Sequence, residues 1–142
     1  MRAEEKSKEP EEGFSAILEL ASVGAVLGDA EDRVLRVNPK MCEITGYSEE
    51  ELFGKTPADL THPDDVEQDL ETFRRMAAGE TPVYDRETRY VRKDERIRWV
   101  SVNATPIRDE NGRLLRIASV ILDITERKQA EERLSARRVK RH

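Results

Sequence analysis

The residues of this 142-residue chain that are best suited to chemistry are His62, Asp64 and Asp65. An imidazole and two carboxylates within four positions could ligate a metal ion. The same residue types also suit the start of a helix, in which Pro63 takes the first turn and acidic side chains lie near the positive end of the helix dipole. We expect a helix that starts here and ends at Gly79, and no metal site.

Nucleophilic catalysis would need a cysteine or serine beside a base such as histidine. The one cysteine is Cys42, which we expect to be a small core residue, and the only histidine besides His62 is His142. There is no glycine-rich phosphate loop, and no segment resembles the ATP-binding half or the phosphoacceptor segment of a histidine kinase. We therefore expect no enzymatic activity and keep a small-molecule enzyme only as a remote alternative.

Composition and charge predict one cytoplasmic domain. A lone cysteine excludes an internal disulfide, which is typical of a reducing compartment. No apolar run approaches the roughly 18 residues of a membrane span, and the N-terminus does not resemble a signal peptide. Residues 126–142 carry a net charge of +4, against −9 for the rest. Because Glu and Ala interrupt these cations and no aromatic residue accompanies them, we expect a solvated helix that binds no nucleic acid.

Local signals predict short helices in the first half of the chain. Residues 1–12 are polar and expected to be disordered, and residues 13–22 have the apolar spacing of an amphipathic helix. Asn38 can cap a helix that ends in a left-handed cap at Gly46, and a capping box formed by Ser48 and Glu51 predicts another. The apolar residues of the first helix are Phe14, Ile17, Leu18 and Ala21.

Apolar runs predict five strands. The first two flank a hairpin turn at 29–32, and Asn111 with Gly112 is a strong hairpin signal before the last strand. Two strands, a run of helices and then three strands indicate an α+β domain with an antiparallel sheet. The predicted strands are 23–27, 34–37, 83–92, 96–107 and 114–124.

Several motifs together resemble the PAS family, in order and at the family's spacing over roughly residues 14–134. They are residues 38–48 (NPKMCEITGYS), 50–55 (EELFGK), 62–65 (HPDD), 99–100 (WV), 105–109 (TPIRD) with 111–112 (NG), and 123–128 (DITERK). The resemblance implies a PAS domain over 23–125, with strand order 2-1-5-4-3 and short helices on one sheet face around a pocket. It also implies flanking N- and C-terminal helices that commonly join homodimers.

The triplet Asp123-Ile124-Thr125 resembles the family's junction between sensor and effector. It follows an apolar strand and leads without a loop into a charged helix over 126–142. We expect this continuity to transmit strain in the sheet to the helix. The chain is therefore interpreted as a sensor or interaction module in signal transduction, either free-standing or the input fragment of a sensor histidine kinase or diguanylate cyclase.

The resemblance also bears on cofactors. Flavin-binding relatives carry a reactive cysteine within the stretch that matches 54–57, where this chain has Pro57, and flavin-contacting amides near Tyr90, Val100 and Ile121, none of which is an amide. We therefore expect no flavin.

Haem-binding relatives ligate iron through a histidine on the long helix. That position falls near Gln68 in this chain, so haem would require His62 to turn inward. We expect no haem and no other cofactor, and a small, largely uncharged ligand if any, since we identify no inward counter-ion for a buried charge.

Strand alternation, together with the resemblance, gives two candidate sets. Residues that turn inward form the candidate ligand pocket or simply the core. Residues that turn outward leave an apolar patch that needs cover, which we expect from the helix over 13–22 in a symmetric homodimer or, alternatively, within one chain. The inward set is Ile44, Leu52, Leu60, Phe73, Met76, Tyr90, Val100, Val102, Ala104, Ile117, Ser119 and Ile121. The outward set is Trp99, Ala118, Val120 and Leu122, with Phe14, Ile17, Leu18 and Ala21 as its cover.

Overall fold

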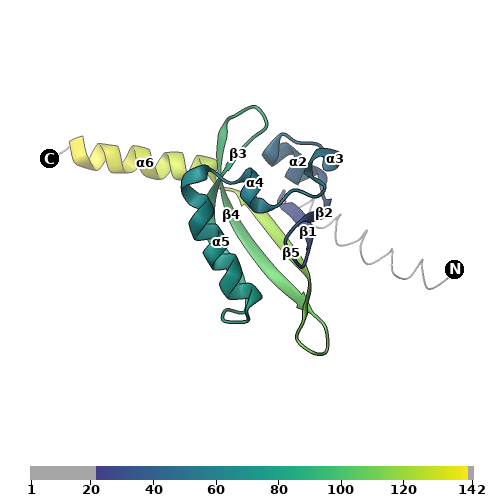
Figure 1. Ribbon diagram of the computed structural model, residues 1–142. Coiled ribbons are helices and arrows are strands. Elements are labelled where there is room, and N and C mark those ends of the chain that lie inside the picture. The colour runs from purple at the N-terminus through teal and green to yellow at the C-terminus, as the bar shows by residue number, and fades with distance from the viewer. Residues whose placement is uncertain (1–21, 141–142) are drawn as a thin grey trace.

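An antiparallel sheet organises the structure, a computed structural model that describes residues 22–140 (Figure 1). Its strand order is β2-β1-β5-β4-β3, which confirms the predicted α+β class and topology. The predicted segments 1–12 and 13–22 lie outside the described residues, except for Ser22. The strands are β1 (Gly24–Asp29), β2 (Val34–Val37), β3 (Tyr84–Val91), β4 (Ile97–Arg108) and β5 (Leu114–Asp123). The helices are α2 (Pro39–Thr45), α3 (Glu49–Leu52), α4 (Pro57–Leu60), α5 (Pro63–Ala77) and α6 (Thr125–Lys140).

Local capping signals place the short helices. Asn38 caps α2, and Gly46 ends it in the left-handed conformation at φ 76°, as predicted. The capping box of Ser48 and Glu51 at the start of α3 is also confirmed. The short helices therefore begin and end where side chains satisfy their free backbone groups.

The start of α5 also protects the edge of the sheet. His62 caps the helix through Nδ1, which accepts a hydrogen bond from the Asp64 N–H at 3.1 Å, as the interpretation of a helix start predicts. The backbone N–H of His62 donates to the carbonyl of Arg89 on β3 at 2.8 Å, and Thr61 forms a bridge with Tyr90. The segment that enters α5 thus covers the free side of edge strand β3 at Arg89 and Tyr90.

Alternation along the strands separates a buried face from an outer face. On β4, Val100, Val102 and Ala104 are buried under the helices, while Ser101 and Asn103 face the other way. Helices α2 to α5 lie on the buried side of the sheet (Figure 1).

The central strand β5 continues almost directly into α6. It lies between β1 and β4 and ends at Asp123, and α6 begins at Thr125, one residue before the predicted start. Only Ile124 separates them, and it is 5% exposed. Helix α6 projects away from the domain (Figure 1). No helix within residues 22–140 is long and apolar enough to cross a membrane.

We expect Asn38→Ala to destabilise the fold by about 2–4 kcal/mol, more than a helix cap alone contributes. Asn38 Oδ1 accepts from the N–H groups of Met41 (3.1 Å) and Ala25 (2.9 Å), and Nδ2 donates to the Val23 carbonyl (2.9 Å). Urea unfolding measures the loss. The matched control is Ser48→Ala, an exposed cap expected to cost about 1 kcal/mol. Equal losses would contradict a role for Asn38 beyond capping.

Candidate functional site

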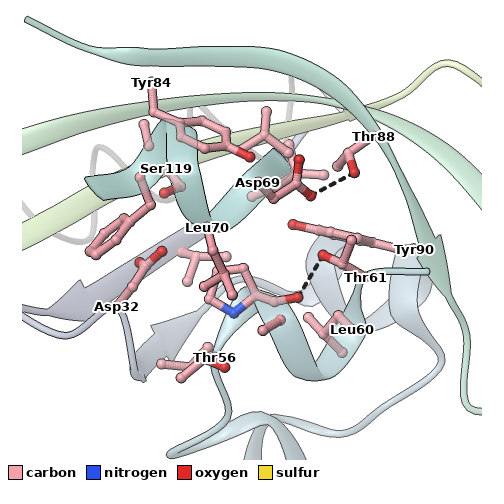
Figure 2. Close-up of a pocket in the computed structure, with 18 of the residues that line it drawn as sticks. Asp32, Thr56, Leu60, Thr61, Asp69, Leu70, Tyr84, Thr88, Tyr90 and Ser119 are labelled. Carbon is pink, nitrogen blue, oxygen red and sulfur yellow. Dashed lines mark hydrogen bonds between the residues drawn. The ribbon is translucent and has the colours of Figure 1, made fainter. Parts of the chain in front are cut away.

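A cavity of about 150 Å³ lies between the inner face of the sheet and helices α4 and α5 (Figure 2). It is lined mostly by apolar and aromatic side chains from strands of the sheet and from the helices that cover it. The exposed lining residues Glu31 and Leu70 lie on the β1–β2 turn and on α5, so this side of the cavity faces solvent. Such a space can hold a compact organic molecule.

The structure brings together seven of the twelve residues predicted to form the pocket. The other five are each at most 3% exposed and fill the core around the cavity without lining it. The residues that line it are Leu60, Phe73, Tyr90, Val102, Ala104, Ser119 and Ile121. The residues that do not line it are Ile44, Leu52, Met76, Val100 and Ile117.

The expectation that no charged group faces inward is wrong. Asp69 on α5 lines the cavity at 8% exposure, and its Oδ2 accepts a hydrogen bond of 2.7 Å from the Thr88 hydroxyl (Figure 2). Its Oδ1 lies 2.5 Å from Nε of Arg86 on β3. A buried carboxylate is tolerated here because the guanidinium supplies an opposite charge and the Thr88 hydroxyl a hydrogen bond.

Two tyrosine hydroxyls complete the polar side of the cavity. Burial raises the pKa of Tyr84, and the charge of Asp69 adds to the rise. Burial likewise raises the pKa of Tyr90, with smaller contributions from Asp32 and Asp69. Both hydroxyls therefore stay protonated near neutral pH and keep a hydrogen that they can donate.

Asp32 is a second carboxylate at the cavity, and sequence reasoning missed it. It stands in the β1–β2 turn with a left-handed backbone at φ 63° and points inward from the side opposite Asp69 (Figure 2). Within residues 22–140 its carboxylate makes no hydrogen bond or ion pair. Burial, and secondly the charge of Asp29, raise its pKa to about 7. The side chain therefore titrates near neutral pH.

The polar residues at the cavity that were not predicted differ in whether a sequence pattern indicates their direction. Arg86 and Thr88 share strand parity with Tyr90, and Asp69 lies one helical turn before Phe73, so periodicity places all of them inward. Asp32 is different, because the direction of a side chain in a left-handed turn does not follow from periodicity.

The size of the cavity bears on cofactors. A protein cavity of about 150 Å³ binds benzene, and the ring systems of flavin and haem are several times larger than benzene. Pro57, Tyr90 and Ile121 line the cavity, whereas Gln68 is exposed. The expectation of no flavin and no haem stays a prediction. Among residues 22–140, no group of three His, Cys, Asp or Glu side chains could hold a metal ion.

The outer face of the sheet carries the predicted apolar patch. Leu122 is 46% exposed there, and Val120 is half-buried. Two cations approach the ring of Trp99, the Arg89 guanidinium at 5.4 Å and the Lys128 ammonium at 4.8 Å from its centroid. The predicted covering residues are Phe14, Ile17, Leu18 and Ala21, which lie outside the described part of the chain.

The junction between β5 and α6 is bound to β4 by its backbone and side chains. The Thr125 hydroxyl donates to Asp123 Oδ1 at 2.6 Å and accepts from the Trp99 N–H at 3.0 Å. The Ile124 N–H donates to the Trp99 carbonyl at 2.9 Å. The first turn of α6 is therefore fixed to the strand beside it.

A second connection joins α6 to edge strand β3. Glu87 lies between Arg127 and Lys128, with Lys128 Nζ 2.7 Å from its Oε1. Its pKa is lowered, first by the hydrogen bond from Lys128 and then by the one from Arg127. We call this contact, together with Lys128 over Trp99, the α6 latch. It holds α6 on the outer side of the same strand whose inner side lines the cavity.

Comparisons with known proteins agree with this architecture. A family model described as PAS fold matches residues 34–121. The probable diguanylate cyclase DgcE of Escherichia coli (strain K12) is 33% identical over 132 residues, which make up 92% of this chain and 12% of that protein. The sensor histidine kinase TmoS of Ectopseudomonas mendocina is 31% identical over 122 residues, with the matched region covering 86% of this chain and 12% of that protein.

A solved structure gives the same fold. The sensory box histidine kinase/response regulator from Burkholderia thailandensis E264 has a TM-score of 0.73 at 24% identity. The match covers 91% of this chain and 98% of that one. By contrast, the chain spans only 12% of the length of each of the two curated relatives.

We expect Asp32→Asn to raise the free energy of unfolding by about 2 kcal/mol at pH 8. This is about half of the free energy that corresponds to the rise in the pKa of Asp32, because water still reaches this half-buried side chain. The folded-state pKa of about 7 lies above the ordinary 3.8. The folded state therefore holds the proton more tightly, and the natural protein loses stability as the pH rises between these two values.

Urea unfolding between pH 4 and pH 8 measures this gain, which should shrink toward zero at the acidic end. Asp85→Asn, which removes an exposed carboxylate on β3, is the matched control. A gain from Asp32→Asn that does not change with pH would contradict the titration.

Proposed function

This chain belongs to the PAS family, and from that premise we propose that it is a sensor or interaction module whose cavity controls the exit helix α6. The observation that carries the proposal is that β3 lines the cavity with one face and holds α6 with the other. A ligand in the cavity or a bound partner would favour one of two arrangements of this strand and so shift their populations.

The first step of the proposed relay couples the cavity to β3 through α5. Asp69 holds Thr88 and Arg86 on the inner side of the strand. One helical turn earlier, Asp65 receives hydrogen bonds from Nε (3.0 Å) and Nη2 (2.8 Å) of Arg89. Asp65 and Asp69, on successive turns of α5, thus both bind side chains of β3. A ligand that displaces α5 would therefore also displace this strand.

The second step couples β3 to α6 through the α6 latch. Arg89, which Asp65 holds, also lies over the ring of Trp99, and Lys128 of α6 approaches the same ring. Glu87, two residues before Arg89, holds Arg127 and Lys128. Exposed ion pairs are individually weak and are screened by salt. The latch can therefore release when the strand moves.

The relatives suggest what α6 would control. They are a probable diguanylate cyclase and a sensor histidine kinase, and this chain matches a short part of each. We propose the corresponding role for this domain, as an input to such an enzyme. A free-standing module that docks on a partner protein is the second candidate, since the charged surface of α6 is available for docking.

A cavity-filling substitution tests the relay without a ligand. Ala104→Leu adds three carbon atoms that point into the cavity, and we expect amide hydrogen exchange in the first two turns of α6 to become about threefold to tenfold faster. Glu87→Gln, which weakens the α6 latch directly, is the positive control. Asn103→Leu places the same leucine side chain on the outer face of the same strand and should leave hydrogen exchange in α6 unchanged. Unaltered exchange in Ala104→Leu, with the positive control responding, would rule out the relay.

We also propose a symmetric homodimer through the outer sheet face, since Leu122 is 46% exposed beside Val120 and Trp99. A charge in such an interface opposes association. Leu122→Glu should therefore shift sedimentation equilibrium toward the monomer by at least tenfold in the dissociation constant. Phe53→Glu, which changes a 63% exposed side chain after α3, should not. A natural protein that sediments as a monomer would refute the dimer.

A further inference from the structure

The cavity has the size and lining of a site for one small, compact molecule. Its volume of about 150 Å³ equals that of a protein cavity that binds benzene. Three aromatic side chains, Phe73, Tyr84 and Tyr90, line it. Their ring faces attract cations as well as apolar groups.

The charges around the cavity have one sign. Glu31, Asp32 and Asp69 line it, and none of its lining residues is a lysine, arginine or histidine. Asp69 is already neutralised by Arg86 at 2.5 Å, and Glu31 lies 3.2 Å from Nη2 of Arg33. Asp32 is therefore the carboxylate at the cavity whose charge is uncompensated.

The surroundings of Asp32 explain why it lacks a partner within the chain. Its Oδ1 lies 3.0 Å from the position that a side chain on Gly28 would occupy, so the missing side chain of Gly28 leaves room for the carboxylate. The charged or titratable groups that face it are Asp29, Glu31, Asp69 and Tyr90, which are acidic or neutral. Within residues 22–140, no cationic side chain pairs with this half-buried carboxylate.

We propose that the cavity binds a small organic cation, a protonated amine with a compact apolar body. Its ammonium group pairs with Asp32, and its apolar part packs against the aromatic rings. Anions are repelled by the uncompensated charge of Asp32, and neutral isosteres leave Asp32 unpaired. The inference rests on the cavity of the proposed function and names its ligand class.

Binding of three probes of similar size, benzylamine, benzyl alcohol and benzoate, tests the proposal. Isothermal titration on the full chain at pH 8 should show benzylamine binding at least tenfold tighter than benzyl alcohol, and no binding of benzoate. Amide chemical shifts should place benzylamine beside Ala104, Ser119 and Ile121, which separates the cavity from surface carboxylates. The preference for benzylamine should fall at least threefold at pH 5.5, where Asp32 is protonated.

Asp32→Asn should remove the tenfold preference while benzyl alcohol binding stays the same. Asp85→Asn makes the same charge change at an exposed position and should keep the tenfold preference for benzylamine. Equal affinities for benzylamine and benzyl alcohol, a preference that survives Asp32→Asn, or no benzylamine binding up to about 10 mM would each overturn the assignment. The hydrogen-exchange test of Ala104→Leu needs no ligand, so its result stands whatever these titrations show.

Discussion

The contact between Asp69 on α5 and the Arg86 and Thr88 side chains on β3 is the constraint around which the domain is arranged. The Asp69 carboxylate is 8% exposed, and burying it without these partners would cost free energy. Moving the helix along the strand would therefore separate a buried charge from the groups that compensate it. This requirement fixes where α5 crosses the sheet and therefore the height of the cavity beneath it. An all-apolar contact would hold the helix less directionally, because the hydrophobic effect itself is non-directional.

The same strand serves two surfaces because successive residues point to opposite faces. Thr88 turns toward the cavity, while Glu87 and Arg89 turn toward α6 and Trp99. As an edge strand, β3 is paired along its length with β4 alone and on its other side only with the short segment at Thr61 and His62, whereas central β5 lies between two strands. In the proposed relay, the covalent junction after β5 would act as the pivot, and β3 would supply the contact that changes.

Sequence reasoning succeeded where the determinants were local. Caps such as Asn38 and His62 follow from hydrogen bonds within a few residues, and strand alternation assigned the inner face. It did not distinguish lining residues from core residues such as Val100, because an empty space depends on how side chains from different helices meet. The position of Lys128 beside Trp99 depends on the angle at which α6 leaves the sheet, which no periodic pattern contains.

Trp99 gives the molecule a built-in optical reporter. It is the only tryptophan in the chain, so intrinsic indole emission comes from a single known place. Its ring contacts both Arg89, which is bound to the helix over the cavity, and Lys128, which belongs to the departing helix. A displacement of either cation would alter the electric field at that indole, so the colour and brightness of its fluorescence would report the movement without a label.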